Sequence, residues 1–301
     1  MKRELLDFLK MNEVEYQENL CLRKYSSVKI GGIASVVIFP DTVEKMITAI
    51  DFLWKNKIDY KIFGRLTNVL IADDPIFSVI IKTDNIRGVY KYDGRIRLYA
   101  GERLSSISYK LASQGIDGFC ELSGIPGSIG GMIKNNAGAF GVEVSDIIES
   151  AVVYSPDDGE SIILNSGDMK FEYRDSIFMH ESLVILYADF KIKQNDPKAI
   201  LSKITELKER RCKSQPLSYP SLGSVFKKLP FDSASRIIDE AGLKGLAIGG
   251  AQISEKHAGF IINKGNASFE DYKKLLEYVK RTVYDKYGVS LIEEIEIYKG
   301  K

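Results

Sequence analysis

The segment from Gly124 to Gly141, GIPGSIGGMIKNNAGAFG, constrains the fold more than any other part of this 301-residue chain. Six of its eighteen residues are glycine, the residue selected where φ must be positive or where another group approaches the backbone closely. The segment is too apolar for a flexible linker and too interrupted for a helix. Because successive backbone N–H groups can form a phosphate-binding concavity, we expect a loop that holds a phosphate-bearing ligand, with a tight structural loop as the alternative.

Two common phosphate-binding motifs are absent from the sequence. No GxGxxG opens a helix directly after a strand, which excludes the Rossmann fingerprint, and no GxxxxGK[ST] occurs, which excludes a P-loop. The glycine-rich segment therefore predicts another mode of binding a dinucleotide.

The composition is that of a globular protein, with 45% apolar and 28% charged residues. A chain of 301 residues is long enough for two or three domains. The net charge of +1 favours neither nucleic acid nor a membrane surface as a partner. No stretch reaches the length of a transmembrane helix, and the N-terminus lacks the apolar core of a signal peptide. We expect a cytoplasmic monomer.

Cysteine and histidine are too sparse for the common metal sites. Cys21, Cys120 and Cys212 are far apart and form no CxxC pair, so zinc and redox motifs are not expected. Free thiols are typical of the cytosol. His180 and His257 are the only histidines, which excludes a three-histidine site, and we expect no metal.

The N-terminal part predicts a β-α-β unit. Residues 2–11 have the pattern of a short amphipathic helix. A strand at 35–39, a helix capped by Asp41 and a strand at 60–63 follow, with the strands parallel. A turn is expected at 64–68.

The middle part predicts an antiparallel sheet. Strand-like patterns at 77–83 and 95–101 precede a helix at 104–113 and the glycine-rich segment. Three further strands, around 147–155, 161–165 and 183–192, alternate as antiparallel strands do, and PDDG at 156–159 is typical of a hairpin turn.

The last third predicts a separate α+β block. A charged helix at 196–212 is expected to link it to the preceding part. A long helix begins with a capping box from Ser268 to Asp271 and ends at Gly288. A final strand at 291–298 would place Glu294 and Glu296 on one face. The expected domains are 1–75, 76–195 and 196–301.

Several side chains are suited to chemistry, and each also has a structural explanation. Lys29, beside paired glycines in KIGG, can meet a phosphate, although a hairpin turn explains it equally well. Arg174 in FEYRDSIF suits a carboxylate or phosphate; the alternative is a surface pair with Asp175. Ser224 follows a glycine and can donate a proton, but the absence of GxSxG argues against a hydrolase nucleophile. His257 and Glu294 are candidates that a structural histidine and a solvated strand edge explain as well.

The order and spacing of these motifs resemble one known family. KIGG is followed by a G-x-x-[ST]-N turn, AG, GIPGSIGG with NNAGA, YRDS, PSLGSVFK, SEKHAGF and a terminal acidic strand. Together, over about residues 20–298, they are similar to the shorter form of UDP-N-acetylenolpyruvoylglucosamine reductase, also called UDP-N-acetylmuramate dehydrogenase. GIPG-x-x-GG, YRDS and SEKHAGF are highly specific in combination.

The resemblance implies an α+β flavoprotein with a two-part FAD-binding region of the vanillyl-alcohol-oxidase/p-cresol-methylhydroxylase type and a C-terminal α+β substrate domain. Neither histidine lies in the 64–68 turn or in the glycine-rich segment, which favours non-covalent FAD. The positions that match FAD contacts are Lys29, Gly31, Gly32, Gly64, Arg65, Thr67, Asn68, Ala100, Gly101, Gly124, Pro126, Gly127, Ser128, Gly130, Gly131, Asn136, Ala137 and Gly138.

The resemblance also implies the reaction, a step of peptidoglycan precursor synthesis. NADPH reduces FAD, and the flavin then reduces the enolpyruvyl group of a nucleotide-sugar substrate. Arg174 matches the enolate-stabilising arginine, Ser224 the proton donor and Glu294 the assisting terminal glutamate. The expected substrate-binding residues are Tyr173, Arg211, Lys213, Gln215, Lys227, Lys228 and His257.

The sequence departs from the family pattern at several positions. Arg65 and Leu66 replace glycines of the usual G-G-G-S-N turn, which affects close contact of the backbone with a pyrophosphate. Asn135 replaces a methionine, and Lys228 replaces an asparagine that contacts substrate.

Two other interpretations stay open. One is an oxidase of the same fold that acts on an alcohol or a sugar lactone. The other is a non-enzymatic nucleotide-binding paralogue, supported by the altered 64–68 turn and opposed by the presence of Arg174, Ser224 and Glu294 together.

Overall fold

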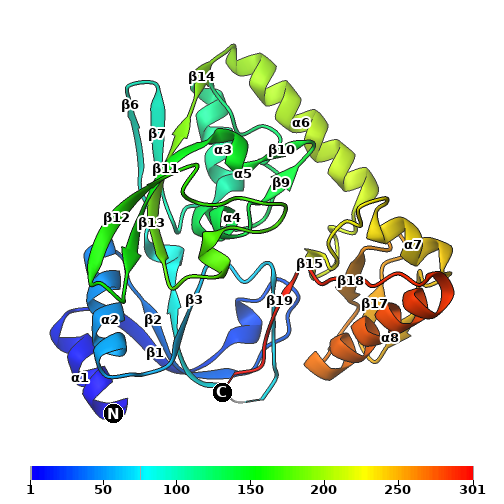
Figure 1. Cartoon of the computed structure of the whole chain (residues 1–301), viewed down its shortest axis with the longest axis horizontal. Coiled ribbons are helices and arrows are strands. Elements are labelled where there is room, and N and C mark those ends of the chain that lie inside the picture. Colours follow the sequence, from blue (N-terminus) through cyan, green and yellow to red (C-terminus); the bar gives the residue numbers. More distant parts are fainter. Residues whose placement is uncertain (1, 75, 301) are drawn as a thin grey trace. The chain divides into compact units, whose positions relative to one another are not determined.

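The computed structural model of the chain describes residues 2–74 and 76–300 (Figure 1). The chain forms two compact units. Unit 1 comprises residues 1–18, 36–65 and 78–209, and unit 2 comprises residues 19–35, 66–77 and 210–301. No helix in the described part of the chain is long and apolar enough to cross a bilayer.

A four-stranded sheet with two helices forms the first part of the fold. Its strands lie in the order β1-β2-β5-β3, and β3 and β5 are parallel, with Tyr60 opposite Val79. The predicted parallel pair was the strands at 35–39 and 60–63, and the structure places β5 between them in the order β2-β5-β3. The strand predicted at 77–83 therefore joins this sheet in parallel with β3, and its placement with the antiparallel strands of the middle part was wrong. The elements are α1 (Lys2–Met11), β1 (Glu15–Cys21), η1 (Leu22–Lys24), β2 (Ile33–Phe39), α2 (Val43–Lys55), β3 (Tyr60–Phe63) and β5 (Ile76–Lys82). Residues 19–21 of β1, η1, residues 33–35 of β2 and residues 76–77 of β5 belong to unit 2, and the rest of this sheet with its two helices belongs to unit 1.

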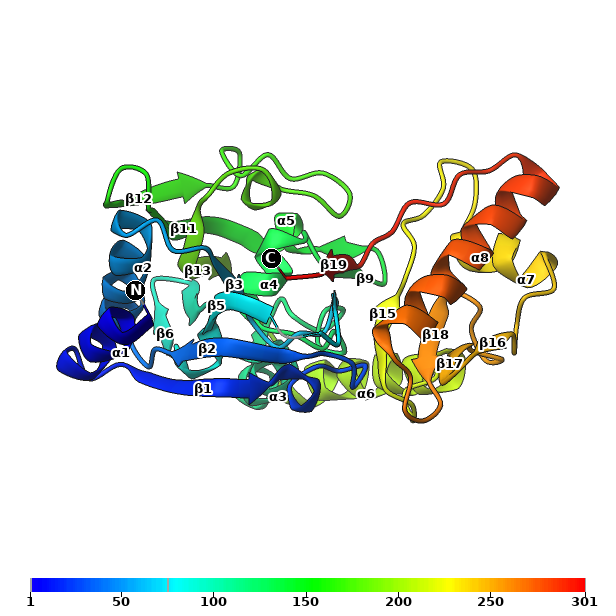
Figure 2. The same ribbon diagram turned by 90° about the horizontal axis from the view of Figure 1, so that it is seen from below.

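The helix α2 begins one residue later than the sequence predicts. Thr42, and not Asp41, is its N-cap, because the Thr42 hydroxyl accepts a hydrogen bond from Lys45 N at 3.2 Å. Asp41 instead pairs with the Lys45 ammonium group. Figure 2 shows α1 and α2 near one end of this sheet. The core here combines Leu5, Leu9, Ile38, Met46, Ile50, Leu53 and Ile81.

A five-stranded antiparallel sheet, in the order β12-β11-β13-β7-β6, also lies in unit 1. The predicted antiparallel strands and the hairpin at 156–159 are confirmed, since Ser155 lies opposite Glu160. The strands are β6 (Val89–Tyr92), β7 (Arg95–Tyr99), β11 (Ile148–Ser155), β12 (Glu160–Asn165) and β13 (Val184–Lys191). The other elements are η2 (Thr83–Asn85), α3 (Leu104–Ser113), β8 (Ile116–Asp117), α4 (Ile129–Lys134), β9 (Gly138–Ala139), β10 (Val142–Glu143), α5 (Val144–Ile147), η3 (Ile177–Met179) and β14 (Lys193–Gln194).

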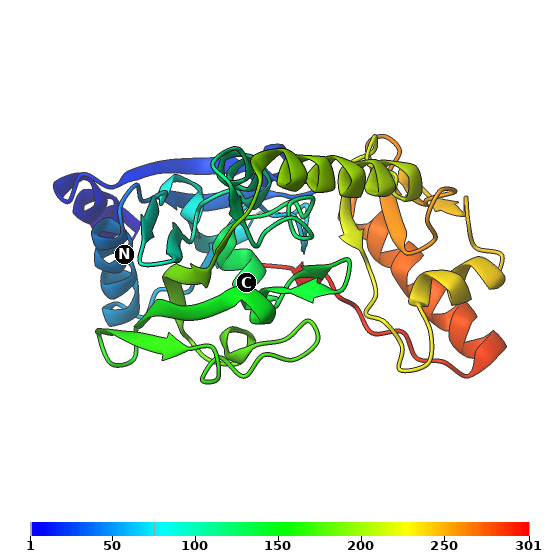
Figure 3. The ribbon, with the colours of Figure 1, turned by 90° about the horizontal axis from the view of Figure 1, so that it is seen from above.

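A four-stranded antiparallel sheet covered by α8 forms most of unit 2, in the order β15-β18-β17-β16 (Figure 3). Separately, β19 pairs in parallel with β4, with Glu296 opposite Val69. The elements are β4 (Val69–Ile71), β15 (Ser221–Ser224), α7 (Ala234–Glu240), β16 (Ala247–Ile248), β17 (Ala251–Ile253), β18 (Phe260–Asn263), α8 (Phe269–Tyr287) and β19 (Glu296–Tyr298). The helix α6 (Pro197–Ser214) belongs to unit 1 up to Glu209 and to unit 2 from Arg210.

The helix α8 has the boundaries that its local sequence predicts. Ser268 Oγ accepts from Asp271 N, and Asp271 accepts in return from Ser268 N. Gly288 ends the helix at φ +67°, where glycine avoids the Cβ penalty. One face of the helix is apolar and buried in the unit 2 core, with Phe269, Tyr272, Leu276, Val279 and Val283.

The last strand is shorter than predicted. It begins at Glu296, so Glu294 lies in the extended segment before β19. This segment pairs elsewhere: Glu294 N donates to Val225 O at 2.8 Å and Lys227 N to Ile292 O at 2.8 Å. The α+β class is confirmed. The three-domain division at 75/76 and 195/196 stays a proposal.

Candidate functional site

The glycine-rich segment folds as a loop followed by the short helix α4. Ser128, the N-cap of α4, is buried, and its hydroxyl accepts from Gly131 N at 3.4 Å. Gly127 has φ +152°, within the region that favours glycine. Gly130 N donates to Ala100 O at 2.9 Å. Because the N–H groups of Gly130 and Gly131 already bond within the protein, these glycines would serve a ligand by leaving space.

Gly131 lies beside space that the protein's own side chains do not fill. It lies inside α4, where alanine is more favourable than glycine by about 1 kcal/mol. A Cβ there would meet only Ser128 Oγ, at the ordinary contact distance of 3.5 Å. The protein itself therefore gives no steric reason for glycine at this position, as expected if a bound cofactor needs that space.

Positive charge gathers at the start of the 64–68 turn. The Lys82 ammonium group donates to Gly64 O and pairs with Asp84 at 2.8 Å. Arg65 pairs with Asp84 at 3.5 Å. Burial, followed by the neighbouring Arg103 cation, lowers the pKa of Arg65 below its ordinary value. Lys82 and Arg65 thus share one carboxylate, Asp84, at the start of the turn, which suits a diphosphate.

The turn is strained at the position of a lost glycine. Leu66 has φ +53°, a conformation in which a branched side chain is uncommon. The boundary between the units falls between Arg65 and Leu66, so Gly64 and Arg65 belong to unit 1, and Thr67 and Asn68 to unit 2. Asn68 Nδ2 donates to Glu294 O at 3.1 Å, and Glu296 N donates to Asn68 O at 2.9 Å.

Other predicted cofactor positions have packing roles within the protein. A Cβ on Gly101 would lie 1.9 Å from Thr83 O, and one on Gly32 would lie 2.2 Å from Asp74 O. Gly31 N donates to Asp73 at 3.3 Å. Lys29 is exposed, with its ammonium group donating to Lys24 O at 3.2 Å. Ala100 is buried beside Gly130.

Arg174 lies in a tight turn of unit 1. Glu172 and Asp175 exchange backbone hydrogen bonds of 3.1 and 3.2 Å, and Arg174 between them has φ +54°. Its guanidinium donates to Gly138 O at 3.1 Å and to Asn136 O at 3.4 Å. The Tyr173 ring packs 4.9 Å from it. The structure therefore brings Arg174 together with the Asn136–Gly138 end of the predicted cofactor loop.

Ser224 and Glu294 come together in unit 2. Ser224 ends β15, directly after Gly223 at φ +81°, and lies opposite Phe260. The hydrogen bond from Glu294 N to Val225 O places Glu294 next to the Ser224–Val225 backbone. Ser224 Oγ makes only a long contact, 3.4 Å, to Phe226 O. Arg174 belongs to unit 1, and the other two catalytic candidates belong to unit 2.

Two of the predicted substrate-binding residues hold orphaned polar atoms. Arg211 Nε and Gln215 Oε1 are buried without a hydrogen-bond partner among the described residues. Burial lowers the pKa of the Arg211 guanidinium. Because a buried unsatisfied polar atom costs about 1–3 kcal/mol, this pair fits a site completed by a polar ligand.

The remaining substrate-binding candidates differ in exposure. Lys213 and Lys228 are exposed, and Lys227 is half-buried. His257 is half-buried, its Nδ1 accepts from Gly259 N at 3.2 Å, and burial lowers its pKa.

Sequence reasoning missed Glu143 and Lys82. The Glu143 carboxylate lies 3.4 Å from Arg174 and accepts from Asn136 Nδ2 at 3.0 Å. Neither residue lies in a sequence motif that indicates catalysis or binding. The available signal was the position of Glu143, two residues after the end of the glycine-rich segment.

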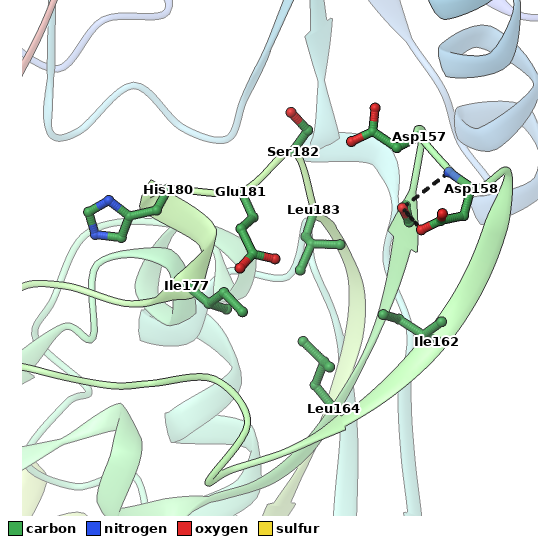
Figure 4. Close-up of a pocket in the computed structure, with 10 residues that line it drawn as sticks. Asp157, Asp158, Ile162, Leu164, Ile177, His180, Glu181, Ser182 and Leu183 are labelled. Atoms are coloured by element: carbon green, nitrogen blue, oxygen red, sulfur yellow. Dashed lines mark hydrogen bonds between the residues drawn. The ribbon is translucent and has the colours of Figure 1, made fainter.

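A separate cavity of about 430 Å³ lies beside the 156–159 hairpin (Figure 4). Asp157, Asp158 and Glu181 line it together with Ile162, Leu164 and Leu183. None of the predicted site residues lines this cavity. Within residues 2–74 and 76–300, no group of His, Cys, Asp and Glu side chains is placed to hold a metal ion.

Two family models match the chain. One, an FAD binding domain, matches residues 34–165, and the other, the C-terminal domain of UDP-N-acetylenolpyruvoylglucosamine reductase, matches residues 215–298. The chain therefore carries an FAD-binding domain, as the resemblance implies.

Relatives that are similar over nearly the whole chain support the same assignment. The UDP-N-acetylenolpyruvoylglucosamine reductase of Petrotoga mobilis is 41% identical, with 95% of both chains covered, and that of Caldanaerobacter subterraneus is 40% identical, with 99% of both covered. The crystal structure of the reductase from Thermus caldophilus superposes with a TM-score of 0.80 at 30% identity, covering 95% of this chain and 98% of that one. With an FAD-binding domain, the matching C-terminal domain and relatives similar over their whole length, this chain belongs to the UDP-N-acetylenolpyruvoylglucosamine reductase family.

Proposed function

We propose that the chain reduces UDP-N-acetylenolpyruvoylglucosamine to UDP-N-acetylmuramate in peptidoglycan precursor synthesis, with NADPH as reductant and non-covalently bound FAD. Membership of the family over nearly the whole chain supports the activity. The observation that carries the proposal is the partly buried guanidinium of Arg174, held against the backbone of the predicted cofactor loop.

Bound FAD would supply hydride transfer, from NADPH to the methylene carbon of the enolpyruvyl group. Gly131 leaves room beside α4 for such a group, and Arg65 and Lys82 supply positive charge near Gly64 that suits its diphosphate. The residues present thus fit the cofactor.

Arg174 stabilises the negative charge that develops on the enolpyruvyl carboxylate side. Its side chain is 16% exposed, so water screens this interaction less than it would at the surface. A pre-oriented cation needs little reorganisation as charge develops, which is the main source of electrostatic catalysis.

Ser224 donates the proton to the adjacent carbon, and Glu294 assists at the same enol. The long contact of Ser224 Oγ leaves its hydroxyl able to turn toward a substrate. Serine is a poor acid, so a neighbour must lower the cost of its deprotonation. An ionised carboxylate would repel the serine alkoxide, so the role proposed for Glu294, beside the Ser224–Val225 backbone, is at the enol and not on Ser224.

Arg211 and Gln215 bind polar groups of the nucleotide. Their orphaned Nε donor and Oε1 acceptor are complementary to an acceptor and a donor on the same ligand. Tyr173, Lys213, Lys227, Lys228 and His257 remain proposed substrate contacts. We also propose that the protein works in the cytoplasm as a monomer, consistent with its free thiols.

Anaerobic stopped-flow absorbance of the purified protein tests the function. NADPH should bleach the flavin band, and the enolpyruvyl UDP-sugar should then restore it. Bleaching without recovery would indicate a different acceptor. Protein that cannot be reconstituted with FAD would contradict the cofactor assignment and favour the paralogue interpretation.

A further inference from the structure

The cluster around Arg174 contains an acidic residue that the proposed chemistry does not use. Glu143 Oε1 lies 3.4 Å from Arg174 NH1, and Glu143 Oε2 accepts from Asn136 Nδ2 at 3.0 Å. We infer that Glu143 is a positioning residue: one of its carboxylate oxygens is held by Asn136, and the other fixes the direction of the Arg174 guanidinium. The inference rests on the role proposed above for Arg174.

The backbone of Glu143 is held on two sides. Glu143 N donates to Asp146 Oδ2 at 2.8 Å, and Glu143 pairs with Gly138 across the β9–β10 hairpin. A Cβ on Gly138 would lie 2.7 Å from Glu143 Cγ, so the stem of the side chain passes directly over that glycine. The carboxylate therefore starts from a fixed backbone and a confined stem, and its contacts with Asn136 and Arg174 give it one direction.

The hydrogen bonds of Asn136 fix which atom of its amide faces Glu143. Its Nδ2 donates to Glu143 and to Glu172 O, both at 3.0 Å, while its Oδ1 accepts from Ser145 N at 3.0 Å. Asn136 is 1% exposed and cannot reverse its amide without losing these bonds. Only a group with two acceptor oxygens can satisfy Asn136 and Arg174 together.

Glutamine at position 143 would break this pattern with almost no change of shape. One of its two terminal atoms is a donor, which would face the donor of Arg174 or of Asn136. Aspartate keeps both acceptors on a stem shorter by one methylene. Glu143→Gln therefore tests the loss of one acceptor oxygen, and Glu143→Asp tests the shortening of the side chain.

The test measures the two half-reactions of the FAD-loaded enzyme separately. Glu143→Gln should slow flavin reoxidation by the enolpyruvyl UDP-sugar on the order of tenfold to a hundredfold, as misorientation of a catalytic group does. Flavin reduction by NADPH and the melting temperature should stay close to wild type. Glu143→Asp should recover part of the loss. The matched control is Glu149→Gln, because Glu149 pairs with Arg95 at 2.6 Å in the same unit, outside the predicted site.

A double-mutant cycle with Arg174→Lys decides whether Glu143 acts through Arg174. Lysine lacks the planar fork that the carboxylate orients, so Glu143→Gln should have little further effect on reoxidation in that background. An undiminished effect, or an equal slowing of both half-reactions with a lower melting temperature, would overturn the inference.

The cycle also separates the two proposals. If Arg174→Lys is slow in reoxidation and Glu143→Gln is normal, only the positioning role is wrong. If Arg174→Lys reoxidises at the wild-type rate, the proposed role of Arg174 is wrong, and the role of Glu143 with it.

Discussion

Lys82 and Asp84 form a largely buried ion pair in unit 1. Lys82 Nζ lies 2.8 Å from Asp84 Oδ2, and the Lys82 side chain is 2% exposed. Burial lowers the pKa of Lys82, and the nearby Asp84 carboxylate opposes that shift. Because the same ammonium group donates to Gly64 O, the pair connects the end of β5 to the start of the 64–68 turn.

Replacing this lysine should cost stability. Lys82→Met keeps the length of the side chain but removes the buried donor to Gly64 O and the closer of the two cations that pair with Asp84, leaving Arg65 at 3.5 Å. Removal of one partner of a buried pair typically lowers the free energy of unfolding by roughly 3–5 kcal/mol. Urea unfolding of the wild type and the variant measures the difference.

The control for this prediction is Arg281→Met. Arg281 pairs with Asp285 at 3.6 Å on α8, with the two side chains 85% and 63% exposed. An exposed pair of this kind contributes about 1 kcal/mol or less. Equal losses in the two variants would show that the Lys82–Asp84 pair has no special structural role.

Ser224→Ala should separate the two half-reactions. The variant lacks the hydroxyl proposed as proton donor, so flavin reduction by NADPH should remain fast while product formation falls by roughly 10²- to 10⁴-fold. Rapid-quench product analysis and flavin absorbance measure both. Ser221→Ala, on the same strand, is the control, because Ser27 bonds to the Ser221 backbone carbonyl and would be unaffected. An equal loss in both half-reactions would exclude the proton-donor role.

Gly131→Ala should weaken FAD binding without weakening the fold. Alanine raises helix propensity inside α4, and the protein has room for the Cβ. If the cofactor occupies that space, overpacking costs about 1–3 kcal/mol, roughly ten- to hundredfold in the Kd measured by flavin fluorescence. Gly167→Ala is the control, since a Cβ there meets no atom of the described residues within 4 Å. Unchanged FAD affinity would place the cofactor away from Gly131.

Burial of His257 should make stability depend on pH. Its pKa in the folded protein is lower than its ordinary value of 6.5 because burial disfavours the imidazolium. Between the two pKa values the unfolded chain binds more protons, so stability falls as pH falls below 6.5. His257→Asn, whose amide oxygen can accept from Gly259 N, should lose less stability than wild type over that range. Melting temperatures at pH values on both sides of 6.5 measure this; parallel curves would contradict it.

Local sequence determined the elements whose ends depend on near neighbours. The capping box at Ser268, the left-handed Gly288, the hairpin at 156–159 and the helix α3 all involve residues a few positions apart. Such interactions form between residues that are already close in the chain, so the local sequence is enough to predict them. The family motifs likewise identified the FAD-binding and reductase domains.

Tertiary structure decided what depends on distant pairing. Three features each join residues far apart in the chain: the position of β5 between β2 and β3, the pairing of Glu294 with Val225 outside β19, and the contact of Glu143 with Arg174. Sequence spacing carries no information about which acceptor a buried guanidinium or ammonium group will find. Because an unpaired buried charge is costly, the partners of these groups were decided by tertiary packing and not by local propensity.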